Sequence, residues 1–424
     1  MATWLNMEIG FLKLGLVYKL LIKNMEKLMT TPNLEELMRQ EFKIIDFKTR
    51  VVNLSLITPM KLPFGEVTER PSGVVSIRAS VAGKTVYGFG EGATLPKPLF
   101  TDDCGETIGL ATDELLKRLS QEQVGFNKAI RLVQAHKFNG NFKFPTARMA
   151  VEMTLIDLLS KSFRLNVGSM LGLPDSIHEV SFGKSLGGGS LESTLQEAEE
   201  SIQSGAKKIK LKVTPGNSDT VLQVIHQLGL HHHDLELMVD ANGTFNPQSK
   251  NDLDWLRALD EVGLIMIEEP VSRAGDVKGI EAVRLLKKSL PDLTTPICLD
   301  DCLSDFKITN TALEENLADI VNIKPGRIGS IKKAIELAKR CKELNKQIMV
   351  GGMLEATPGR CMTTTLAALF HSMGFTIPGD LSLAQERLSD DLVPKENQLQ
   401  IGQGGSILIP KGIGWGFGVV EFKK

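Results

Sequence analysis

Charged residues end a series of consecutive apolar runs in this chain. Three successive runs end in an acid, and the runs on either side end in lysine: Lys210, Lys212, Asp240, Glu268, Asp300 and Lys324. If the runs are neighbouring parallel strands, their carboxyl ends meet at one edge and bring these side chains together. A single carboxylate at the end of a strand is more often a helix N-cap or a salt-bridge partner than a metal ligand. The series of such residues on consecutive strands is therefore what indicates a functional site.

Three converging carboxylates repel one another unless a cation holds them together. Hard oxygen ligands favour Mg²⁺, with Mn²⁺ as a substitute. A neighbouring cation lowers the pKa of a lysine, and a lysine brought toward neutrality can act as a general base. The ion would also stabilise the enolate that forms when the proton leaves. The pattern therefore predicts the abstraction of a proton α to a substrate carboxylate.

The elements that must position these residues form a regular series. Eight apolar runs alternate with helical stretches, at 178–186, 207–213, 234–243, 263–270, 295–301, 318–326, 346–353 and 374–380. Eight strand and helix units predict an α/β fold, a TIM-type (β/α) barrel with its active site at the carboxyl ends of the strands. A doubly wound open sheet is the alternative, but no GxGxxG motif follows the first run to support a dinucleotide site.

The rest of the chain predicts a second, smaller unit. Residues 42–165 alternate like strands and then show helical spacing, with "AGKT" at 82–85 as a hairpin turn and a polar loop at 60–73. We therefore expect an α+β capping domain at 42–165, completed by 393–424, and a barrel at 166–392. Residues 1–41 form an N-terminal extension, apolar but interrupted by lysines too often to span a membrane.

Composition limits the remaining function classes. The chain has 424 residues, a formal net charge of −2 and 24% charged residues, without a long basic run. This balance is typical of a soluble protein and argues against nucleic acid or a membrane as partner. The five cysteines are odd in number and scattered, as expected of reduced thiols in the cytoplasm. The expected partner is a small substrate that carries a carboxylate. Formation of a homo-oligomer is a further hypothesis.

Several motifs resemble those of the enolase superfamily, in its muconate-lactonising subgroup. They are "KIKLKVTPG", "VDANGTF", "IEEP", "ICLDD", "VNIKPGRIGS", "GGMLEATPGR" and "IPGDLS", and they are most similar to the o-succinylbenzoate synthase and N-succinylamino acid racemase families. The resemblance implies a barrel with a capping domain, Asp240, Glu268 and Asp300 as Mg²⁺ ligands, Lys212 as general base with Lys210 beside it, and Lys324 on the opposite face. It also implies substrate contacts at Asn242, Gly352, Met353 and Glu355, and a mobile specificity loop at 59–70.

Some positions depart from the family's pattern and leave the substrate open. Asp301 stands where a Glu is usual, and "ATPGRC" replaces a more usual Thr-Gly-x-Gly-Arg-Ala. The leading hypothesis is dehydration to o-succinylbenzoate in menaquinone synthesis. The alternative is racemisation of N-succinylamino acids or epimerisation of dipeptides by both lysines. A barrel that has lost catalysis and acts by binding is a third hypothesis, which the complete set of acids and lysines disfavours.

Overall fold

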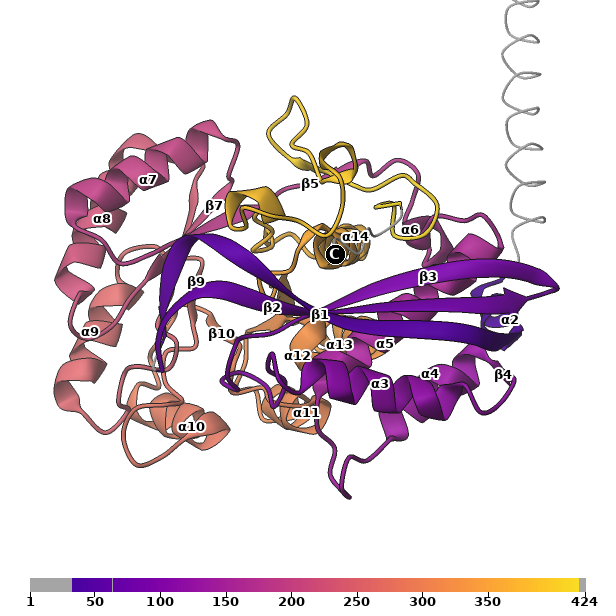
Figure 1. Ribbon diagram of the computed structural model, residues 1–424. Coiled ribbons are helices and arrows are strands. Elements are labelled where there is room, and N and C mark those ends of the chain that lie inside the picture. The colour runs from indigo at the N-terminus through magenta and orange to yellow at the C-terminus, as the bar shows by residue number, and fades with distance from the viewer. Residues whose placement is uncertain (1–32, 63, 419–424) are drawn as a thin grey trace, which may run out of the picture.

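The structure of this protein is a computed structural model that describes residues 33–62 and 64–418 (Figure 1). Most of the predicted N-terminal extension, and the last six residues of the predicted C-terminal segment, thus lie outside the described residues. The described part of the extension contains helix α2 (Leu34–Arg39), which Asn33 caps by accepting a hydrogen bond from the backbone N–H of Glu35.

Within the described residues, no helix combines the length and the apolar character needed to cross a membrane.

The N-terminal part of the described chain is an antiparallel sheet with helices packed against it. The strand order is β3-β2-β1-β4, with β1 (Glu41–Leu62), β2 (Gly65–Val81), β3 (Lys84–Ala93) and β4 (Val124–Gly125). The helices are α3 (Ile108–Leu119), α4 (Phe126–Ala135) and α5 (Pro145–Ser162). The predicted hairpin turn is confirmed, because Ala82 and Gly83 have φ angles of 48° and 76° between the paired residues Val81 and Lys84.

Residues 60–73 differ from the prediction. Instead of forming a polar loop, residues 60–62 and 65–73 belong to a long hairpin in which β1 and β2 stay paired as far as Leu62 and Gly65. The mobility expected for 59–70 stays a prediction. The hairpin reaches from the cap to the barrel (Figure 1), where Leu56 forms a β-bridge with Leu388. An antiparallel pair can carry polar residues along an exposed face, so the polarity of this stretch did not distinguish a strand from a loop.

Helix α5 is the central element of the cap and is buried on nearly all sides. It lies so close to β3 that a Cβ added at Gly90 would sit 2.3 Å from the backbone oxygen of Ala150. The glycines of "YGFGEG" therefore permit this close approach. Asp103 fixes the start of the helix, since its carboxylate accepts the backbone N–H groups of Thr146 and Ala147 at 2.9 and 3.0 Å.

A parallel sheet of seven strands forms the second layer, in the order β12-β11-β10-β9-β8-β7-β6. The strands are β6 (Gly183–Leu186), β7 (Lys208–Lys212), β8 (Glu236–Asp240), β9 (Met266–Glu268), β10 (Ile297–Leu299), β11 (Ile320–Ile323) and β12 (Gln347–Val350). The sheet curls into the predicted α/β barrel (Figure 1). Its helices are α7 (Leu191–Gln203), α8 (Ser218–His231), α9 (Lys250–Asp260), α10 (Gly279–Ser289), α11 (Phe306–Glu314), α12 (Pro325–Ile328), α13 (Ile331–Glu343) and α14 (Thr357–Ser372).

The eighth predicted strand, at 374–380, is not a strand in the structure. The segment still closes the barrel, because Gly183 donates its backbone N–H to the oxygen of Gly379 at 2.8 Å, while Asp380 donates to the oxygen of Val350 at 2.9 Å. Pro378 cannot donate a ladder hydrogen bond, which explains why a regular strand does not form here. The first predicted run is likewise divided, since β5 (Glu179–Val180) pairs outside the barrel and only β6 joins it.

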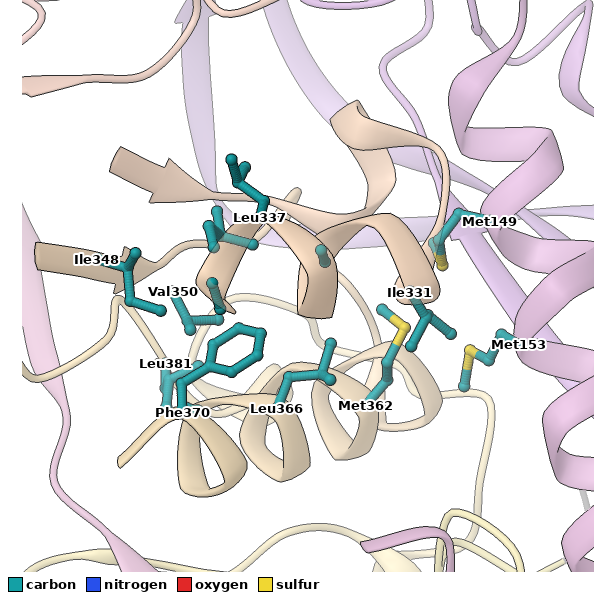
Figure 2. Packing of buried hydrophobic residues seen from close by; sticks show 14 of the residues in the cluster. Met149, Met153, Ile331, Leu337, Ile348, Val350, Met362, Leu366, Phe370 and Leu381 are labelled. Atoms are coloured by element: carbon teal, nitrogen blue, oxygen red, sulfur yellow. The ribbon is translucent and has the colours of Figure 1, made fainter. Parts of the chain in front are cut away.

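Alternation along the barrel strands separates an outer layer from an inner one. In Figure 2, Ile348 and Val350 of β12 face Phe370 and Leu366 of α14, and this packing continues to Ile331 at the start of α13. Met349, between them, belongs to a separate buried cluster with side chains of the other strands. The outer layer holds the helices on the sheet, and the inner layer fills the barrel.

The C-terminal segment returns to the first strands of the barrel and to the cap. It contains the 3₁₀ helices η1 (Ala384–Glu386) and η2 (Lys395–Asn397), then β13 (Ile407–Leu408), which pairs with β5. The buried Trp415 donates its indole N–H to the backbone oxygen of Met153 at 3.1 Å, so the segment packs on α5. Helix α6 (Val167–Met170) lies beside it, since the N–H of Val167 bonds to the oxygen of Gly414.

A buried ion pair within the cap is also hydrogen-bonded to the barrel. Arg70 of β2 and Glu91 of β3 are both fully buried, with Nη2 3.0 Å from Oε1. The same carboxylate accepts the backbone N–H groups of Ala356 and Gly359, each at 2.9 Å, at the start of α14. A carboxylate at a helix N-terminus satisfies its unpaired N–H groups and complements its dipole. The cap therefore holds the segment that follows the carboxyl end of β12.

We predict that Gly90→Ala lowers the free energy of unfolding by about 1–3 kcal/mol, because the new methyl group would force β3 away from α5. Chemical denaturation followed by circular dichroism measures this change. Gly187→Ala is the matched control, since a Cβ there meets no atom within 4 Å. Equal stabilities of the two variants would show that α5 and β3 can separate without cost.

Candidate functional site

The interior of the barrel is built in two layers. The lower layer consists of apolar side chains with one lysine: Lys208, Met238, Met266, Cys298, Ile320 and Met349. Two residues further along β7 to β11, the same inward face becomes polar and charged: Lys210, Asp240, Glu268, Asp300 and Asn322. The strand period of two places both sets inside the barrel, while the intervening residues face the helices. The predicted acids and lysines thus meet above an apolar floor.

The lysines of β7 face inward and bind carboxylates from other strands. Lys212 Nζ donates to Asp240 Oδ2 at 2.6 Å and to Asn242 Oδ1 at 2.8 Å. Lys210 Nζ lies 3.0 Å from Glu268 Oε2 and 3.4 Å from Asp240 Oδ2. The Lys212 side chain is 37% exposed and Lys210 only 7%, so Lys212 is the one open to a ligand at the mouth.

Asp380 supplies the counter-charge to the most deeply buried lysine of β7. This residue lies at the end of the segment that takes the place of the eighth strand. It pairs with Lys210, and its Oδ1 lies 3.0 Å from the Nζ of the fully buried Lys208. Burial alone would raise the pKa of Asp380, but the two ammonium groups outweigh it and hold the pKa well below its usual range. The buried ammonium groups of Lys208 and Lys210 are thus paired with carboxylates within the barrel.

The opposite side of the barrel carries the third predicted lysine. Lys324 follows β11, and its Nζ donates to Asp300 Oδ2 at 2.5 Å. Arg327, one turn further in α12, also pairs with Asp300 and donates from Nη2 to the backbone oxygen of Asn322 at 2.6 Å. Asn322 in turn donates to Glu268 Oε1 at 2.7 Å. A chain of contacts therefore connects the two lysine-bearing sides through the carboxylates.

The negative charges of the three predicted metal ligands affect one another's pKa values. Burial, followed by the nearby charges of Asp240 and Asp300, raises the pKa of Glu268 to about 8, although Lys210 opposes the change. Burial also opposes ionisation of Asp240, but Lys212 and Lys210 outweigh this effect and lower its pKa. The mutual repulsion shows that the carboxylates converge on one region of the barrel.

The lysine pKa values differ from the prediction. Burial would lower the pKa of Lys210, but Asp380 and Glu268 raise it well above its ordinary value. Lys324 behaves in the same way, since Asp300 and Asp301 overcome the effect of burial and raise its pKa. The prediction of lowered values assumed a divalent cation among the carboxylates, whereas in this arrangement the carboxylates pair directly with the lysines.

The donor set fits a hard divalent cation in chemistry and in strand position. Asp240, Glu268 and Asp300 are almost fully buried at the ends of three adjacent strands, and Asp240 is paired in register with Glu268. Their oxygens point to Lys210, Lys212 and Lys324, and the described residues contain no group of three His, Cys, Asp or Glu side chains close enough to hold a metal. The three carboxylates come from neighbouring strands, so they are the residues that would hold such a cation.

The predicted substrate contacts have different surroundings. Asn242, with a φ of 44°, touches Lys212 directly. Gly352 and Met353 are half-buried in the segment after β12. Glu355 is buried and accepts the backbone N–H of Met353 at 2.8 Å, while its other oxygen lies 3.5 Å from Arg360. Its carboxylate therefore stabilises the segment after β12 and does not face the lysines.

The sequence-based prediction did not place four residues in the site: Asn322, Lys208, Asp380 and Arg327. Asn322 lies one strand period before Lys324, so an inward position could have been read from the alternation. The contact of Lys208 with Asp380 comes from the irregular closing segment, which the pattern of the apolar runs did not predict. Nothing in the local pattern around Arg327 indicated that a helical side chain would turn back to Asp300.

Comparisons with known proteins agree with this geometry. Residues 193–423 match the family described as enolase C-terminal domain-like. The chain is 30% identical to an N-succinylamino acid racemase of Thermus thermophilus and 28% identical to an o-succinylbenzoate synthase of Geobacillus stearothermophilus, covering 87% of this chain and 92% of the relative in each case. A solved enolase-superfamily member from Listeria innocua superposes with a TM-score of 0.75 at 25% identity, covering 89% of this chain and 94% of that one.

We predict that Asp380→Asn lowers the free energy of unfolding by about 3 kcal/mol, because it leaves the buried Lys208 without its counter-charge. Adding Lys208→Met should restore part of the loss, since it removes the unpaired ammonium. Denaturant titration of the single and double variants measures this coupling. Asp390→Asn, at an exposed position, is the control. Additive losses in the double variant would contradict the pairing.

Proposed function

Because the chain belongs to the enolase C-terminal domain-like family, we propose that it is a metal-dependent enzyme that abstracts the proton α to a carboxylate. The observation that carries this proposal is the charged layer of the barrel, in which Asp240, Glu268 and Asp300 lie between Lys212 on one side and Lys324 on the other. Buried charges of both signs at one point are costly to fold, so a site of this kind is typical of catalysis.

The three carboxylates would hold Mg²⁺, or Mn²⁺ in its place, and the ion when bound would stabilise negative charge developing on the substrate carboxylate. Lys212 is the proposed base, which as a neutral amine takes the α-proton of the substrate. Lys210 stays protonated among Glu268, Asp240 and Asp380 and balances their charge. Lys324, across the site, holds a second ammonium near the opposite face of the substrate.

The reaction that we propose is dehydration to o-succinylbenzoate, in menaquinone synthesis. The substrate loses its α-proton to Lys212 and then its hydroxyl group, which takes a proton from the Lys212 ammonium and leaves as water. The support is that several relatives along nearly the whole chain are o-succinylbenzoate synthases. Racemisation of N-succinylamino acids is the second candidate. It is favoured by the two lysines on opposite sides of the carboxylates and by the racemase relatives.

The remaining assignments follow from the same proposal. A cap at 42–165, completed by 393–424, would cover a barrel at 166–392, with the mouth between them. We propose a cytoplasmic location, since all five cysteines are free thiols. Formation of a homo-oligomer stays a prediction.

Asp240→Ala and Glu268→Ala should each abolish measurable Mg²⁺ binding, because each removes one of three proposed ligands. Isothermal titration of the purified protein with MgCl₂ tests this directly. Asp254→Ala, on the exposed side of α9, should leave binding unchanged. Unchanged Mg²⁺ affinity in both site variants would exclude the assigned metal ligands.

Incubation in D₂O separates the proposed reactions. With the cyclohexadiene precursor of o-succinylbenzoate, the Mg²⁺-loaded protein should form o-succinylbenzoate, followed by its absorbance. Lys212→Ala should reduce the rate by about a thousandfold or more, the effect of removing a general base. N-succinylamino acids in D₂O provide the comparison, followed by NMR and polarimetry. Rapid α-deuterium exchange and racemisation without o-succinylbenzoate formation would replace dehydration by the second candidate.

A further inference from the structure

Arg273 occupies a fixed place at the mouth of the barrel, outside the machinery described above. It follows β9, and its backbone N–H donates to the oxygen of Gly243 at 3.0 Å. Gly243 has a φ of 72°, and a Cβ there would lie 2.3 Å from Ser272 Oγ, so the two turns are in close contact. A β-bridge between Thr244 and Val271 adds to this constraint. The backbone of Arg273 is therefore held firmly beside the turn that carries Asn242.

The guanidinium of Arg273 is placed close to Lys324. Its Nη2 donates to Asp301 Oδ2 at 2.7 Å, and the other oxygen of Asp301 lies 3.8 Å from Lys324 Nζ. One carboxylate thus connects the proposed catalytic lysine with an arginine further out. The Arg273 side chain is 38% exposed, and the bond to Asp301 is the one hydrogen bond that its guanidinium makes within the described residues. Its remaining N–H groups are available to a ligand.

An aromatic ring from the cap lies next to both cations. The centroid of Phe100 is 5.3 Å from Arg273 Cζ and 5.9 Å from Lys324 Nζ. Phe100 is half-buried in the segment between β3 and α3, so the cap supplies an apolar surface between the lysine and the arginine.

We propose that Arg273 binds a second carboxylate of the substrate and so selects dicarboxylic acids with a short apolar spacer. This inference rests on the proposed function and specifies its substrate class. A guanidinium offers planar paired donors that match a carboxylate. Both candidate reactions concern compounds with a succinyl chain, which ends in such a carboxylate.

Paired ligands test the proposal through binding. Racemic N-succinylphenylalanine and N-butyrylphenylalanine differ in the group at the end of the chain, a carboxylate in one and a methyl group in the other. Calorimetry with Mg²⁺-loaded protein should give a Kd about 10- to 100-fold lower for the succinyl compound, as expected for a charge-assisted hydrogen bond. In Arg273→Met this preference should fall to within about twofold, through weaker binding of the succinyl compound alone.

Arg257→Met is the matched control. Arg257 lies on α9 and also has a 2.7 Å ion pair, with Asp254, so the variant should keep the full preference for the succinyl compound. The proposal is overturned if the wild-type protein binds both compounds equally or neither of them, or if Arg273→Met keeps the preference. Proton abstraction with no preference would overturn this inference alone. Selective binding that depends on Arg273, without turnover of either candidate substrate, would instead overturn the proposed function.

Discussion

The pairing of inward lysines with inward carboxylates is the constraint on which the rest of this structure depends. A buried ammonium or carboxylate is tolerated when an opposite charge and hydrogen bonds replace the lost water. Lys208, Lys210 and Lys212 on one strand therefore require acids on the strands they face. Asp240, Glu268 and Asp380 meet that requirement from three different elements. The barrel must close in one register for these partners to coincide.

The closing segment illustrates this dependence. Residues 374–380 make few ladder hydrogen bonds, and Pro378 limits them further. Two backbone hydrogen bonds and the two lysine contacts of Asp380 hold the segment between β12 and β6. Charge pairing thus contributes to a junction where the other strands use regular backbone pairing. Asp380 therefore both pairs with the lysines of the site and helps to close the barrel.

The cap acts on the mouth through contacts of a different kind. Glu91, paired with Arg70, holds the start of α14 and with it the segment that contains Gly352 and Met353. Phe100 reaches the other side, near Lys324 and Arg273. The barrel supplies the groups proposed for proton transfer, and side chains of the cap lie around them. Relatives with synthase and racemase names share most of this chain's length, which agrees with one reaction apparatus beneath a surface that differs in specificity.

The sequence by itself determined the local features of this protein. The alternation of apolar runs with helical stretches and the charged ends of the runs predicted the barrel, seven of its eight strands and the meeting of the acids with the lysines, because the carboxyl ends of neighbouring parallel strands lie at one edge. Tertiary structure decided the rest. The 60–73 hairpin depends on pairing between β1 and β2, and the contact of Lys208 with Asp380 joins residues far apart in the sequence. The partners of Arg327 and Arg273 likewise depend on how separate loops are placed, since long side chains can reach in several directions and only neighbouring elements determine which charge they meet.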